Sequence, residues 1–132
     1  MKRHLLTLTF LAVIAIGVLH EIGSVFYLYW SVVWFDGLVH YVGALAVGFL
    51  TLWVWYVSGL FGHSTPSRKE AMVFSLLTVM VIGLGWEYFE YAYGIAVPAG
   101  VNYALDTFHD LLFDFLGALT VGFVGRVRGF YE

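Results

Sequence analysis

The sequence predicts an all-α protein, a four-helix transmembrane bundle formed by a single integral membrane domain over residues 1–132. Hydrophobic residues make up 61% of the chain and charged residues 11%, whereas about a quarter of the residues in a typical soluble domain are charged. Most of this hydrophobicity lies in four long apolar stretches. The composition therefore excludes a soluble globular enzyme and a disordered chain. It also excludes a nucleic-acid-binding protein, which needs a basic face.

We expect the apolar stretches to form helices over about residues 5–29, 36–60, 71–93 and 106–125. Each has about 20–25 residues, enough at ~1.5 Å per residue to cross a hydrocarbon core of ~30 Å. Backbone groups in lipid must be paired within the spanning structure, which favours helices over strands. A cleaved signal peptide at the N-terminus is the alternative for the first stretch, but no small-x-small cleavage site precedes His20.

The third helix has two candidate starts. Ser67 and Glu70 have the spacing of a capping box, in which each side chain bonds the other residue's backbone N–H. Thr65 followed by Pro66 is an equal candidate, since proline suits the first helical position. The longest loop is expected over residues 94–105.

Basic residues mark one side of the membrane. All six precede the first helix, lie between the second and third, or follow the fourth: Lys2, Arg3, Arg68, Lys69, Arg126 and Arg128. In a four-span chain these three places share a side, so the positive-inside rule predicts cytoplasmic termini. We therefore expect a multi-pass protein of the plasma (inner) membrane.

The acidic residues show the opposite asymmetry, since only Glu70 and Glu132 lie on the basic side. Seven acids and three histidines lie in the outer half: Glu21, Asp36, Glu87, Glu90, Asp106, Asp110, Asp114, His20, His40 and His109. Counting ~1.5 Å per residue from the basic end of each helix places ionisable groups of all four helices at similar depth, about 16–30 Å from that end.

Helical spacing places most of these residues on shared faces, because positions i, i+3 and i+4 lie together. The sets are Asp36 with His40, Glu87 with Glu90, and Asp106 with Asp110 and Asp114. A charge facing lipid costs at least ~2.5–3.5 kcal/mol, so we expect these side chains to point into the bundle. The small residues Gly43, Ala44, Gly117 and Ala118 should let the helices approach closely beneath them.

Close carboxylates cannot all stay ionised without counter-charge, and this side has no lysine or arginine. Protons, the histidines, a metal ion or a cationic ligand must supply it. We favour a divalent metal ion (Zn, Mn, Mg, Fe or Ca), because the available ligands are Asp, Glu and His and the chain has no cysteine. The expected metal ligands are Asp36, His40, Glu87, Asp106, Asp110 and Asp114. Glu90 and His109 are the expected catalytic residues, as general base or ligand-orienting group.

Simpler roles are open for some of these residues. Asp36 and Asp106 stand where the N-cap of a helix belongs. His20 and Glu21 can lie at the membrane interface, and His109 can hydrogen-bond a neighbouring helix.

Three sequence blocks resemble the YjdF-type family of bacterial inner-membrane proteins and, more loosely, the VanZ-like family. The resemblance spans about Trp34 to Gly122. Its blocks are Phe35-Asp36 with His40, Trp86-Glu87 with Glu90, and Asp106-Thr107 with Asp110, Asp114, Gly117 and Ala118. The chain departs from the VanZ-like pattern at Gly37, where lysine is usual, and at Asp114, where asparagine is common. The resemblance implies a common polar site but no particular reaction.

Three functions fit these features. The first is an enzyme that uses the metal to hydrolyse or transfer a lipid-linked or cell-envelope substrate. The second is a protein that transports or senses protons or cations through the same acids. The third is a non-catalytic subunit of a membrane complex. Beyond the lipid bilayer, a lipid-linked substrate and a homo-oligomer are the partners left open.

The predicted topology can be tested by cysteine labelling, because the chain has no cysteine of its own. A membrane-impermeant maleimide applied to intact cells should label Ala99→Cys, and should label Thr65→Cys only after permeabilisation. Labelling of Thr65→Cys but not Ala99→Cys in intact cells would reverse the topology.

Overall fold

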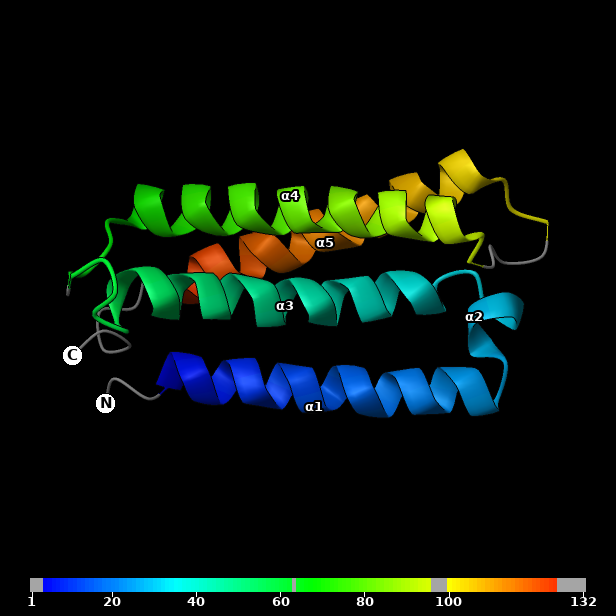
Figure 1. Cartoon of the computed structure of the whole chain (residues 1–132), viewed down its shortest axis with the longest axis horizontal. Coiled ribbons are helices and arrows are strands. Elements are labelled where there is room, and N and C mark those ends of the chain that lie inside the picture. Colours follow the sequence, from blue (N-terminus) through cyan, green and yellow to red (C-terminus); the bar gives the residue numbers. More distant parts are fainter. Residues whose placement is uncertain (1–3, 63, 96–99, 126–132) are drawn as a thin grey trace.

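The computed structural model describes residues 4–62, 64–95 and 100–125, and these residues form helices and turns without a β-strand. The helices are α1 (His4–Val25), α2 (Leu28–Ser31), α3 (Phe35–Tyr56), α4 (Arg68–Tyr93) and α5 (Tyr103–Gly125). The long ones run up and down, so that α1 begins and α5 ends beside the α3–α4 turn (Figure 1). By length and apolar composition α1, α3, α4 and α5 can each cross a membrane. The predicted four-helix transmembrane fold is confirmed.

The membrane orientation of this fold stays a prediction. Arg68 and Lys69 lie in the first turn of α4, at the end where α1 begins and α5 ends. The other basic residues that carry the prediction lie outside the described residues: Lys2, Arg3, Arg126 and Arg128.

The first apolar stretch ends earlier than expected. α1 stops at Val25, and Tyr27, at a left-handed φ of 57°, begins the short helix α2. The Tyr29 ring meets the Phe35 ring edge-on with 5.2 Å between centroids. A Cβ at Gly23 would collide with both rings, so this glycine lets them pack against the end of α1. Aromatic packing thus accompanies a turn of the chain where the length of the apolar stretch predicted a longer helix.

The capping box at the start of α4 is formed. The Ser67 side chain accepts from the Glu70 backbone N–H at 3.2 Å, and the Glu70 carboxylate accepts from the Ser67 backbone N–H at 2.7 Å. This places the start at Ser67 and not at Thr65. At the start of α5, the Asn102 side chain accepts from the Leu105 backbone N–H at 2.8 Å.

The structure does not support the alternative that Asp36 and Asp106 are the N-caps of their helices. Both lie inside the first turn of their helices. The N-cap of α3 is Trp34, which makes no side-chain cap hydrogen bond. Since neither aspartate caps its helix, both carboxylates are available to the interior.

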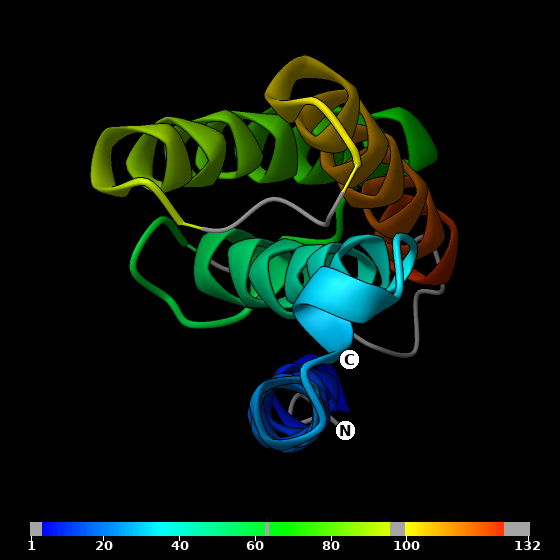
Figure 2. The ribbon, with the colours of Figure 1, turned by 90° about the vertical axis from the view of Figure 1, so that its right-hand side faces the viewer.

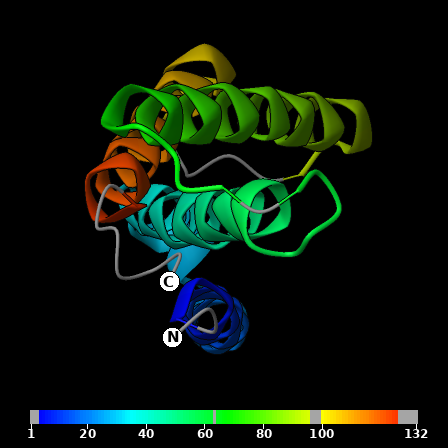
Figure 3. The same cartoon turned by 90° about the vertical axis from the view of Figure 1, so that its left-hand side faces the viewer.

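Helices α3, α4 and α5 pack against one another, whereas α1 packs chiefly on α3. Figures 2 and 3 show α1 set apart from α4 and α5, with α3 between them. α3 and α5 approach each other closely at Gly117, where a Cβ would stand 2.5 Å from Ala44 Cβ and 2.8 Å from the Tyr41 carbonyl oxygen. Gly43, predicted to serve the same packing, instead faces open space, with nothing within 4 Å of its Cβ position.

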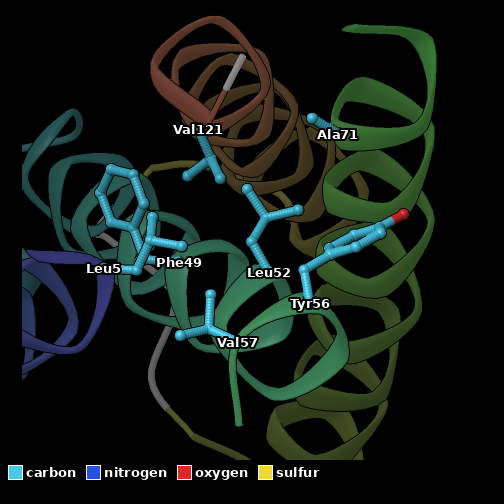
Figure 4. Close-up of a cluster of buried hydrophobic side chains, with 7 residues drawn as sticks. All are labelled: Leu5, Phe49, Leu52, Tyr56, Val57, Ala71 and Val121. Carbon is cyan, nitrogen blue, oxygen red and sulfur yellow. The ribbon is translucent and has the colours of Figure 1, made fainter. Parts of the chain in front are cut away.

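An apolar cluster closes the end of the bundle at which α1 begins (Figure 4). It joins residues of α1, α3, α4 and α5 with Val57 just after α3: Leu5, Phe49, Leu52, Tyr56, Val57, Ala71 and Val121. A smaller layer of Ala44, Val79 and Ala118 lies further along the helices. Large apolar side chains such as Leu77, Val81 and Phe123 are exposed, as expected for surfaces that face lipid.

The packing at Gly117 predicts the effect of one added methyl group. Gly117→Ala should lower the thermal unfolding midpoint in detergent, through overpacking worth about 1–3 kcal/mol. The control is Gly85→Ala, because a Cβ at Gly85 meets nothing within 4 Å. That variant should be neutral or gain up to ~1 kcal/mol from helix propensity. Equal midpoints for the two variants would contradict the close packing of α3 and α5.

Candidate metal centre

The three packed helices each contribute one ligand-bearing side chain to a common point. His40 comes from α3, Glu87 from α4 and Asp110 from α5, and one potential ligand atom of each lies within 4.8 Å of the other two. Their exposed fractions are 7%, 5% and 1%. Helix packing therefore gathers residues from distant parts of the sequence into one buried site.

Further acids overlap with this triad. One potential ligand atom of each of Asp36, Asp106 and Asp110 also lies within 4.8 Å of the other two. The same holds for Asp36, His40 and Glu90. With Asp114, these residues form what we name the acid–histidine cluster. Its members are Asp36, His40, Glu87, Glu90, Asp106, Asp110 and Asp114, all buried except the half-buried Asp36. The structure thus places all seven inside the bundle, where sequence spacing predicted them.

The central triad carries polar atoms without partners. Nε2 of His40, Oε1 of Glu87 and Oδ2 of Asp110 are buried and accept or donate no hydrogen bond within the described residues. The His40 and Glu87 atoms lie 3.5 Å apart. A buried polar atom without a partner costs about 1–3 kcal/mol, and more if it is charged. Each residue of the triad thus carries a buried polar atom that a bound cation would satisfy.

Asp114 has a different position from the other acids. Its Oδ2 lies 3.3 Å from Nδ1 of His40, on the opposite side of the imidazole from the unpartnered Nε2. Gly83 of α4 makes room for this carboxylate, because a Cβ at residue 83 would collide with it. Asp114, predicted as a metal ligand, belongs to none of the converging ligand sets. It is placed to orient His40.

Glu90 is held by a contact that sequence reasoning missed. The Trp86 indole N–H donates to Oε1 of Glu90 at 3.0 Å, one helical turn away. The Tyr103 hydroxyl donates to the Glu87 carbonyl oxygen at 2.7 Å and ties the start of α5 to α4. The i, i+4 spacing of Trp86 and Glu90 was the available sequence pattern for the first contact. No local pattern identified the second.

Three ionisable residues that the sequence placed in the outer half, Glu21, His20 and His109, lie apart from the cluster. Glu21 is exposed on α1, so the expectation that all four helices bring an ionisable group to one site is not met by this acid. His20 is also exposed, and its Nδ1 lies 3.1 Å from the Tyr29 hydroxyl. His109, predicted as catalytic, is half-buried, with its ring edge-on to Phe113 at 6.2 Å.

The cluster is strongly acidic and has no nearby fixed cation. It holds six carboxylates and one imidazole, while the described lysine and arginine, Arg68 and Lys69, begin α4 at the far end of the bundle. The negative charge of the cluster also affects Tyr29 in α2. Burial, and then the charges of Asp36 and Glu90, raise the pKa of the Tyr29 hydroxyl to about 12. That hydroxyl therefore stays protonated and can donate a hydrogen bond beside the cluster.

The family comparison agrees with the fold. A family model described as "Predicted membrane protein (DUF2238)" matches residues 2–129. The chain belongs to this family. DUF2238 membership supports a multi-pass membrane protein but supports neither the YjdF-type nor the VanZ-like resemblance specifically. Searches of curated proteins and of solved structures gave no significant match. This DUF2238 protein is thus a small membrane protein with buried acidic and histidine groups that could hold a metal ion.

Proposed function

We propose that this protein binds a divalent cation between His40, Glu87 and Asp110 and uses it in hydrolysis or group transfer on a lipid-linked or cell-envelope substrate. The observation that carries the proposal is the convergence of three buried side chains from three helices, each of which also has a buried polar atom without a hydrogen-bond partner. The sequence blocks that carry the YjdF-type resemblance lie on α3, α4 and α5, so the resemblance is consistent with a common polar site at these helices and implies no particular reaction.

The ligand set favours a first-row transition metal. Carboxylates alone suit Mg²⁺, Ca²⁺ and Mn²⁺, while an imidazole adds affinity for Zn²⁺ and Fe²⁺. Asp36 and Asp106 share Asp110 with the central triad, so the cluster has donors to complete the coordination or to hold a second ion. The bound-metal stoichiometry distinguishes these two arrangements.

In this proposal the protein residues have separate tasks. Asp114 accepts from Nδ1–H of His40 and so keeps Nε2 free as a ligand atom, the usual arrangement behind a metal-bound histidine. A divalent ion at the triad supplies Lewis acidity to a phosphoryl or carbonyl oxygen. Glu90, buried and held by Trp86, is the candidate proton acceptor. His109 is less suited to that task because it lies outside the cluster.

We further propose that the cluster faces the extracytoplasmic side of the inner membrane. Its residues lie near the start of α3, the end of α4 and the start of α5. Arg68 and Lys69 begin α4 at the other end, and the remaining basic residues precede α1 or follow α5 in the sequence. The positive-inside rule assigns that end to the cytoplasm.

Transport of protons or cations is less well supported by the packing. A conducting path would have to continue from Asp114 towards the end where α5 finishes. The buried layer of Ala44, Val79 and Ala118 and the larger apolar cluster around Leu52 occupy that direction. Neither layer offers a chain of ionisable groups, so the acids are better suited to a site than to a conducting path.

Metal binding can be tested by thermal unfolding of purified protein after treatment with a chelator. Adding Mn²⁺ or Zn²⁺ should raise the midpoint, since a ligand at a hundredfold excess over its Kd stabilises by about 2.7 kcal/mol. Glu87→Gln and Asp110→Asn keep side-chain size while removing a charged ligand, and should abolish the response.

Glu21→Gln is the matched control, because Glu21 is an exposed acid outside the cluster. It should respond to the ion as the wild type does. An unchanged midpoint for the wild type with Zn²⁺, Mn²⁺, Mg²⁺, Fe²⁺ and Ca²⁺ would remove the metal proposal, as would an undiminished response in both amide variants.

A further inference from the structure

A cavity of about 670 Å³ lies beside the acid–histidine cluster, between α1, α3 and α4. Its volume is typical of a small-molecule binding site. Apolar side chains from all three helices form most of its wall, among them Val13, Ile16, Val47, Leu50, Val79 and Ile82. Along α3 the wall runs from Asp36 to Leu50, a length of about 21 Å at ~1.5 Å per residue. We name this cavity the side groove.

One end of the side groove is polar. Asp36, His40, Glu90 and Asp114 of the cluster line the groove there. His20 and Ser24 of α1 and Tyr29 of α2 line it as well. A long apolar groove that ends in ionisable and hydrogen-bonding groups matches an amphiphile with one hydrocarbon chain and a polar head group. An entirely apolar ligand would leave the polar groups at this end without partners.

The open side of the groove faces away from α3. α1 packs chiefly on α3 and makes at most weak contact with α4, and Figure 2 shows the two helices separated. Since α3 forms the floor, the opening lies between α1 and α4, where a spanning bundle meets lipid. Gly43 lines the floor, and its Cβ position has nothing within 4 Å. The groove is therefore accessible to a lipid chain from within the bilayer.

We propose that the side groove binds one acyl chain of a membrane lipid whose phosphate head group is held at the acid–histidine cluster. This inference rests on the proposed function, because six carboxylates without a cation would repel a phosphate. A divalent ion at His40, Glu87 and Asp110 would offset two of these charges and offer a coordination position to a phosphate oxygen, while protons on the remaining carboxylates would reduce the repulsion further. Tyr29, whose hydroxyl lies 3.1 Å from Nδ1 of His20, also lines the groove and offers a hydrogen-bond donor for a phosphate oxygen. The substrate class is thus a phosphate-bearing lipid that enters sideways from the bilayer.

The binding test uses three probes that divide the ligand into parts. They are oleoyl lysophosphatidate, monooleoylglycerol, which lacks the phosphate, and glycerol 3-phosphate, which lacks the chain. Native mass spectrometry of the full chain in detergent, with Mn²⁺ or with a chelator, measures the binding of each. The expected result is one lysophosphatidate per chain, bound more tightly than either fragment, with the preference for phosphate lost in chelator.

Variants of the groove test where the chain lies. Gly43→Leu fills the floor, and Ile16→Trp fills the opposite wall from α1. Each should weaken lysophosphatidate binding by about tenfold or more, because displacing two buried methylene groups of the chain already has that effect. Gly85→Leu is the control, since Gly85 is exposed on α4 and has open space at its Cβ. It should bind as the wild type does.

The outcomes separate this inference from the proposed function, because the Mn²⁺ response is measured without lipid. If the groove variants keep their Mn²⁺ stabilisation and also bind lysophosphatidate as tightly as the wild type, the groove assignment is wrong and the metal proposal stands. If monooleoylglycerol or glycerol 3-phosphate binds as tightly as lysophosphatidate, the phosphate-lipid assignment is wrong. If Mn²⁺ does not stabilise the wild type, the proposed function fails on that readout, and the head-group assignment fails with it.

Discussion

The structure depends on placing many like charges inside a membrane. Six carboxylates and one imidazole lie together within spanning helices, and the described lysine and arginine are at the far end of α4. Each ionised group in hydrocarbon costs at least ~2.5–3.5 kcal/mol, and close carboxylates repel one another. The cluster is therefore stable only where helices surround it and a counter-ion or protons neutralise it. A divalent ion would offset two of these charges and give His40, Glu87 and Asp110 a common partner, and protons on the other carboxylates would supply the remaining neutralisation.

The rest of the bundle follows from bringing α3, α4 and α5 close enough to enclose that charge. Gly117 lets α5 approach α3, and Gly83 leaves space on α4 for the Asp114 carboxylate. The apolar cluster around Leu52 closes the opposite end. α1 contributes Leu5 to that apolar cluster and otherwise packs chiefly on α3. Its separate position leaves the side groove between α1 and α4.

Sequence periodicity was sufficient for the parts that depend on a helix face. Glu87, Glu90, Asp110 and Asp114 point inward as their i, i+3 and i+4 spacing predicted. The sequence did not determine how α1 is rotated about its own axis. Glu21 was therefore expected near the other acids, whereas the structure leaves it exposed. His109 precedes Asp110 by one residue, which turns it by ~100° away from the same face. The hydrogen bond between His40 and Asp114 joins residues 74 positions apart, which no local pattern could predict. The break between α1 and α2 occurs at Tyr27, a position without the glycine or proline that usually marks a turn.

The central claim is that His40, Glu87 and Asp110 share one ion, and anomalous diffraction from crystals grown with Zn²⁺ or Mn²⁺ tests it most directly. The account predicts a peak within the triad, about 2.0–2.2 Å from Nε2 of His40 and from a carboxylate oxygen of each acid. Asp114 should remain on Nδ1 of His40 in that structure. A peak held by other residues, or none in the cluster under conditions that saturate binding, would contradict the account and leave protons as the neutralising charge.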